Sequence, residues 1–73
     1  MDGYERLANA IVLQAAKDYR SALQTVRKNP VNGTAKLEVQ ECERFFRSKW
    51  YSVLTSVDGE YLMKRLREEV EAE

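Results

Sequence analysis

The stretch CERFFRSKWYSVLTSVDGEYLMKRL, residues 42–66, decides the fold of this chain. It contains both phenylalanines, the only tryptophan and two of the four tyrosines of the 73-residue sequence. Two residues within it, Ser48 and Asp58, have side chains that cap a helix N-terminus by accepting hydrogen bonds from backbone N–H groups. We therefore expect this stretch to hold the end of one helix, a short second helix and the start of a third.

Asp58 marks the clearest helix start, because Glu60 follows it and the positive end of the helix dipole favours an acidic residue in the first turn. Ser48 leaves two alternatives open. The helix either breaks after Arg47 or continues to Leu54, since the apolar residues keep helical spacing across Ser48. We favour a break, because the serines and the threonine that follow are poor helix formers.

Upstream of this stretch, the sequence predicts one long helix over residues 3–27. Asp2 and Glu5 fit an N-terminal capping box. Residues 10–16 (AIVLQAA) are apolar except for Gln14. The helix is therefore apolar almost all round there, and such a helix is buried on more than one side. The second side is covered either by another subunit, which we favour, or by the rest of a compact bundle.

Residues 29–33 (NPVNG) form the one clear break, because Pro30 has no backbone N–H with which to continue a helix. Thr34 is the expected N-cap of the helix that follows. We therefore expect a single all-α domain over residues 1–73, a small bundle of three to four helices built on the long N-terminal helix. The expected helices span residues 3–27, 34–47, 49–54 and 58–70.

The chain is short for an independent fold. A chain of this length buries only about 60% of the surface that it exposes when unfolded. Such a core rarely contributes more than about 3–5 kcal/mol. The single cysteine excludes an intrachain disulfide, and the absence of histidine argues against a zinc site. Self-association or a well-packed helical core therefore has to supply the stability, and we favour a homo-oligomer.

The charges balance, with twelve basic and twelve acidic residues, although residues 1–37 carry a net charge of +3 and residues 38–73 one of −3. A neutral chain is a poor candidate for binding nucleic acid, which depends on many phosphate contacts. The sequence has no run of about 18 apolar residues and no secretory signal. Because the lone cysteine also fits a reducing compartment, we expect a cytoplasmic protein that does not enter the membrane.

The sequence offers no catalytic set. No histidine is present to act as a general base, and Cys42 lies on the apolar face of its expected helix, as a core thiol does. The carboxylates alternate with lysines and arginines in the pattern of a solvated face. The three glycines stand apart, so there is no phosphate-binding loop. We expect no enzyme activity, no cofactor and no metal site.

The remaining signal is a set of basic and aromatic residues. Arginine offers a planar fork that binds phosphate or carboxylate, and aromatic faces stack on bases and cations. Such groups, particularly at a subunit boundary, would suit a nucleotide-like anion. The alternative is that the aromatic residues form the core and the arginines pair with glutamates. The candidate ligand-binding residues are Arg44, Arg47, Trp50, Tyr51, Tyr19, Arg20 and Tyr61.

The motif F-F-x-S-x-W-Y-x-x-L-T-x-x-D-G-x-Y-L, from Phe45 to Leu62, resembles a stretch in small accessory proteins of phages and integrated mobile elements of Gram-positive bacteria. The segment AIVLQAAKDYR, from Ala10 to Arg20, is similar to the same group. The resemblance covers most of the chain and brings no catalytic residues. It implies an accessory protein that acts by binding in the cytoplasm of a bacterial host.

Three functions follow as hypotheses. The first is a non-enzymatic protein that counteracts host defence by sequestering a small anionic, nucleotide-like signal. The second is an inhibitor or adaptor that binds a host defence protein. The third, which the balanced charge disfavours, is a nucleic-acid-binding accessory protein.

Overall fold

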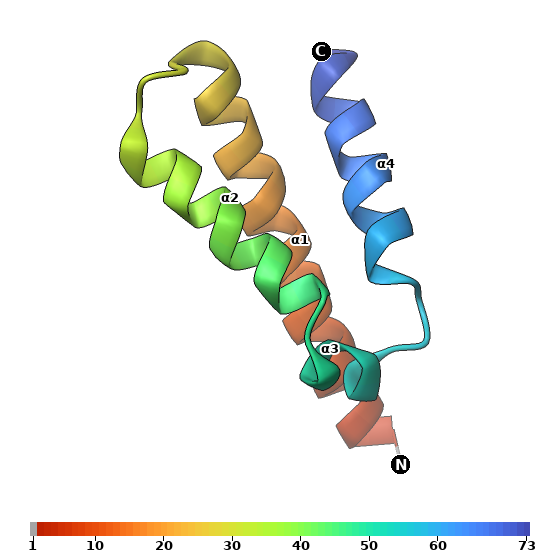
Figure 1. The fold of residues 1–73 in the computed structure, drawn as a ribbon. Coiled ribbons are helices and arrows are strands. Elements are labelled where there is room, and N and C mark those ends of the chain that lie inside the picture. The colour runs from red at the N-terminus through yellow and green to blue at the C-terminus, as the bar shows by residue number, and fades with distance from the viewer. Residues whose placement is uncertain (1) are drawn as a thin grey trace.

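Four helices and their connections make up residues 2–73, the part of the chain that the computed structural model describes (Figure 1). These residues contain no strand. The prediction of an all-α bundle built on a long N-terminal helix is therefore confirmed, and every helix end lies within one residue of its expected position. The helices are α1 (Asp2–Lys28), α2 (Gly33–Phe46), α3 (Lys49–Leu54) and α4 (Gly59–Glu71).

The long helix α1 contacts all three other helices (Figure 1). α2 returns antiparallel along it, the short α3 lies beside its N-terminal half, and α4 runs in the same direction as α1. The C-terminus therefore lies at the same end of the molecule as the α1–α2 connection. The bundle is elongated, with dimensions of 43 × 22 × 18 Å, and α3 lies at the opposite end from the C-terminus.

Aromatic side chains fill the centre of the bundle. Tyr19, Phe46 and Tyr51 are buried together with Met63 and Leu66. The ring centroids of Tyr19 and Phe46 lie 5.6 Å apart, and those of Phe46 and Tyr51 lie 5.5 Å apart, both edge to face. Aromatic pairs prefer this geometry. The core therefore draws on all four helices.

The start of α4 packs directly against the end of α2. A Cβ atom at Gly59 would overlap the backbone carbonyl of Phe46 and would lie 3.4 Å from Cε2 of Tyr51. Only glycine, which has no Cβ, permits this close approach. The contact brings the first turn of α4 beside the last turn of α2, where Glu60 meets Arg47.

Two of the expected helix starts are confirmed. Ser48 Oγ accepts a hydrogen bond from the backbone N–H of Tyr51 at 3.1 Å, and Asp58 Oδ1 accepts one from that of Glu60 at 3.0 Å. Both residues have extended backbone conformations and are the N-caps of α3 and α4. The helix therefore breaks at Ser48, and the alternative of one continuous helix to Leu54 is wrong.

The N-cap expected at Thr34 is wrong. Asn32 caps α2, and its side-chain oxygen accepts a 3.0 Å hydrogen bond from the backbone N–H of Ala35. Asparagine satisfies the free donors of a first helical turn at least as well as threonine does, so the helix begins earlier, at Gly33. The capping box expected at Asp2 lies outside the described structure, because it depends on a side chain that the structure does not describe.

The apolar segment of α1 is only partly covered by its own chain. Ile11, Val12 and Ala15 are half-buried, whereas Leu13 is 64% exposed. This exposed side is the one for which the sequence predicts a second subunit. The homo-oligomer stays a prediction.

Candidate functional site

The structure distributes the predicted ligand-binding residues over the molecule. Tyr19 and Tyr51 lie in the core, with exposed fractions of 0% and 3%, so neither ring is open to a ligand in this chain. The reason is visible in the helical spacing of α1, where Tyr19 falls in line with Ala15 and Ala22 on the side that packs against the core. For both tyrosines, the structure fits the alternative interpretation of a core residue.

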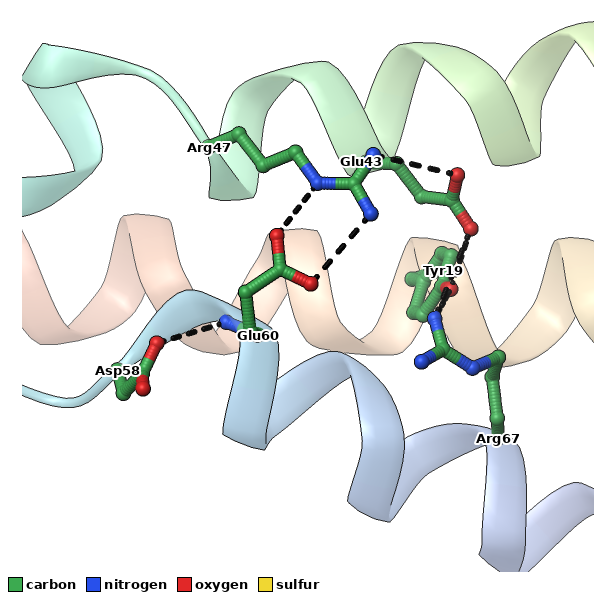
Figure 2. A network of polar contacts seen from close by, with 6 residues as sticks. All are labelled: Tyr19, Glu43, Arg47, Asp58, Glu60 and Arg67. Carbon is green, nitrogen blue, oxygen red and sulfur yellow. Dashed lines mark hydrogen bonds and ion pairs between the residues drawn. The ribbon is translucent and has the colours of Figure 1, made fainter.

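The hydroxyl of Tyr19 lies in a polar network that joins α1, α2 and α4 (Figure 2). It donates a 2.8 Å hydrogen bond to Oε2 of Glu43 and accepts a 3.1 Å hydrogen bond from Nη1 of Arg67. The same Arg67 nitrogen lies 3.8 Å from Oε2 of Glu43. Burial and the hydrogen bond to Glu43 raise the pKa of Tyr19 above its ordinary value. The hydroxyl therefore stays protonated and links three helices.

Arg47 extends this network along α2 (Figure 2). Its Nε and Nη2 atoms donate hydrogen bonds to the two carboxylate oxygens of Glu60 at 2.6 and 3.4 Å, and its Nη1 atom lies 3.8 Å from Oε1 of Glu43. The hydrogen bond from Arg47 lowers the pKa of Glu60. Arg20 likewise pairs with Glu69 at 2.7 Å. Carboxylates of α4 therefore already partner two of the three predicted arginines, Arg20 and Arg47.

The other predicted residues are accessible and come from three different helices. Trp50 on α3 and Tyr61 on α4 are each 57% exposed. Arg44 is exposed on α2 and shares a surface cavity of about 480 Å³ with Arg47. No aromatic side chain lines this cavity, so the structure brings together two of the predicted arginines without a stacking surface. The cavity is lined by Gln40, Glu43, Arg44 and Arg47.

Tyr51 has a buried hydroxyl without a hydrogen-bond partner among the described residues. The rings of Phe45 and Phe46 lie edge-on to its ring, with centroids 5.7 and 5.5 Å away. Burial and the nearby charge of Asp58 raise the pKa of Tyr51. A buried polar group left unsatisfied costs about 1–3 kcal/mol, so this hydroxyl is a cost to stability that can be measured.

Four large apolar side chains on α3 and on the first turns of α1 are more than half exposed, a feature that the sequence analysis missed. Tyr4 and Val53 line one cavity of about 540 Å³ between these two helices. Leu7 follows Tyr4 by three residues on α1, Trp50 precedes Val53 by three on α3, and residues three apart lie on the same side of a helix. We call these four residues the α3-end patch. Their exposed fractions are 62%, 60%, 57% and 65% for Tyr4, Leu7, Trp50 and Val53.

The sequence analysis also missed the contact between Glu43 and Arg67, two further residues of this polar network. The sequence assigns Glu43 to the polar face of its helix and gives no signal for Arg67. Their meeting depends on how α4 packs against α2, and no local pattern reports that packing. The i,i+4 spacing of Glu43 and Arg47 was the one visible signal.

No group of three or more His, Cys, Asp or Glu side chains within residues 2–73 could hold a metal ion. Cys42 is half-buried, and burial, together with the nearby carboxylate of Asp18, raises the pKa of its thiol. A raised pKa disfavours the reactive thiolate. Over the same residues, no helix combines the length and apolar character needed to cross a membrane.

No protein-family model, curated protein or solved structure matches this chain. The resemblance of residues 45–62 to phage accessory proteins therefore stays a prediction. What the protein binds has to be inferred from its own side chains and cavities.

Proposed function

We propose that this chain is a non-enzymatic binding protein that docks onto another protein through the α3-end patch. The observation that supports this is that Tyr4 and Val53 line one cavity, and that Leu7 and Trp50, each three residues along the same helices, are like them more than half exposed. Contiguous exposed apolar patches are uncommon on monomeric proteins and often mark interaction sites. Tryptophan and tyrosine are also among the residues that most often dominate binding energy at protein interfaces.

Covering the patch would contribute a useful binding free energy. Fully burying one large apolar side chain contributes about 1.5–3 kcal/mol. Because more than half of each side chain is exposed, a partner that covers all four would gain on the order of 5 kcal/mol. The entropic cost of association opposes this gain, so polar contacts around the patch have to supply the rest. Such a balance suits a regulated, reversible complex.

A phage accessory role in a bacterial cytoplasm, with a host defence protein as the partner, is part of this proposal. Its support is the resemblance of residues 45–62 and 10–20 to phage accessory proteins. A homo-oligomer is a further part, supported by the 64% exposure of Leu13 on the second apolar side of α1. The support for each part is separate from the exposure of the α3-end patch.

The proposal is tested by capturing a partner from a lysate of a Gram-positive host with three baits: the wild-type protein, Val53→Glu and Leu37→Glu. Leu37 is 55% exposed on α2 and gives a matched control, because it receives the same charge at a similar exposure outside the patch. We expect one partner that wild type and Leu37→Glu retain and Val53→Glu loses. Equal retention by all three baits would refute docking through the patch, as would capture by none. Analytical ultracentrifugation of the same variants shows whether the partner is a second copy.

Sequestration of a nucleotide-like anion is the second candidate. The observation that favours it is the shared cavity of Arg44 and Arg47, with a volume of about 480 Å³. It ranks second for two reasons. A phosphate bound in this cavity has to displace Glu60 from Arg47, and no aromatic ring lines the cavity to stack on a base. Native mass spectrometry of protein purified from the host tests it: retained mass of a few hundred daltons that Arg44→Ala removes is expected, and an unliganded chain counts against it.

A further inference from the structure

A cavity of about 330 Å³ lies between the C-terminal halves of α1 and α4. It is separate from the α3-end patch, which lies at the other end of the bundle (Figure 1). Its volume is at the lower end of the range for small-molecule sites, about 300–1,000 Å³. The lining residues are Leu23, Val26 and Arg27 of α1 and Arg67, Val70 and Glu71 of α4.

The walls of this cavity combine an apolar surface with guanidinium groups. Leu23, Val26 and Val70 supply aliphatic side chains, and Val70 is almost fully buried. Arg27 and Arg67 both line the same space. An apolar wall beside a positive group is complementary to a molecule with an apolar body and an anionic head.

Both arginines keep donors for such a head group. Nη1 of Arg27 donates a hydrogen bond to the backbone carbonyl of Val70. Nη1 of Arg67 donates one to the hydroxyl of Tyr19 and lies 3.8 Å from the carboxylate of Glu43, which is outside the lining. Each guanidinium has five N–H donors, so each has more donors than these contacts use. Glu71 is the one carboxylate of the lining, so the ionised lining residues have an excess of one positive charge. That balance suits a single negative charge.

We propose that this cavity binds a small monocarboxylate with an aliphatic body, its carboxylate held by Arg27 and Arg67 and its body against Leu23, Val26 and Val70. A nucleotide does not fit the same description, because no aromatic side chain lines the cavity to stack a base and several phosphate charges would exceed the positive charge there. The proposal is independent of the protein-docking function and of the Arg44–Arg47 cavity.

The test is an NMR titration of the full chain with octanoate as the probe. Two compounds separate its parts: octanol has the apolar body without the charge, and acetate has the charge without the body. We expect octanoate to shift the backbone amides of Leu23, Val26 and Val70 in a saturable manner, and both control compounds to bind at least tenfold more weakly. No saturable shift at these amides, or equal binding of octanol and octanoate, overturns the proposal.

A pair of variants tests the role of the arginine. Arg27→Gln removes one proposed carboxylate ligand, and Arg20→Gln is the matched control, because Arg20 is also on α1, also contacts α4, and does not line the cavity. Loss of a hydrogen bond to a charged group predicts that Arg27→Gln weakens octanoate binding about tenfold or more, while Arg20→Gln leaves it unchanged. Equal effects of the two substitutions overturn the assignment. Circular dichroism of both variants, which should match the wild type, excludes a simple loss of fold.

Discussion

Replacing Tyr51 by phenylalanine should stabilise this protein, although Tyr51 lies in its core. The hydroxyl is buried and has no hydrogen-bond partner among the described residues, a situation that costs about 1–3 kcal/mol. The phenylalanine ring keeps the edge-to-face contacts with Phe45 and Phe46. The small gap left by the hydroxyl offsets part of the gain. We expect a net stabilisation of about 1 kcal/mol, which corresponds to a rise in Tm of about 4–8 °C for a domain of this size.

Tyr19→Phe is the matched control, because it removes the same atom from another tyrosine of the same core cluster. Here the hydroxyl has two partners, Glu43 and Arg67. A hydrogen bond of this kind contributes about 0.5–1.5 kcal/mol. Glu43 and Arg67 have side chains that are 25% and 40% exposed, so water can replace part of what they lose. We expect a destabilisation of about 1 kcal/mol, opposite in sign to the effect of Tyr51→Phe.

Urea unfolding followed by far-UV circular dichroism measures both effects. A shift in the midpoint at constant m-value reports a change in stability alone. Fluorescence of Trp50, the only tryptophan, provides a second probe of two-state behaviour. If Tyr51→Phe destabilises the protein as much as Tyr19→Phe does, the Tyr51 hydroxyl has a partner, and the reasoning is refuted.

Three further predictions concern the helix ends. Gly59→Ala places a methyl group against the last carbonyl of α2 and should cost about 1–3 kcal/mol; an unchanged urea midpoint would contradict the close packing. Asn32→Ala should cost about 0.5–2 kcal/mol, whereas Thr34→Ala, at the expected but unused cap, should cost less in the same assay. The pKa of Glu60 is lowered by Arg47, so its contribution to stability is present above its unfolded pKa, about 4.3, and is lost as the pH falls through the folded value. Urea midpoints measured across the acid range should therefore fall less steeply for Glu60→Gln, and parallel curves would argue against the pair.

The helix boundaries were predictable because local chemistry determines them. Ser48 and Asp58 each satisfy a backbone donor two or three residues later, within their own segment. The same reasoning explains the error at Thr34. Asn32 and Thr34 both have capping side chains, and no local rule decides between two such residues so close together.

The candidate site was less predictable because it depends on how the helices pack. Helical spacing places Tyr19 on the apolar line of α1, but the sequence does not say whether a tyrosine there turns its hydroxyl to water or to a buried partner. Arg20 meets Glu69 across 49 positions of sequence, and Arg47 meets Glu60 across 13. Neither pair follows from a local pattern. From the sequence, the alternative that the aromatic residues form the core and the arginines pair with glutamates was open. Only the packing of the helices favours that alternative.

Stability and binding can be separated at α3, because Trp50 is exposed in the α3-end patch while its neighbour Tyr51 is buried. Tyr51→Phe changes the core without altering the patch, and Val53→Glu alters the patch at a position that is 65% exposed. The double variant should therefore gain the stability of Tyr51→Phe and still bind no partner. If partner binding instead returns as stability rises, Val53→Glu acted by unfolding α3, and the docking proposal would lose its support.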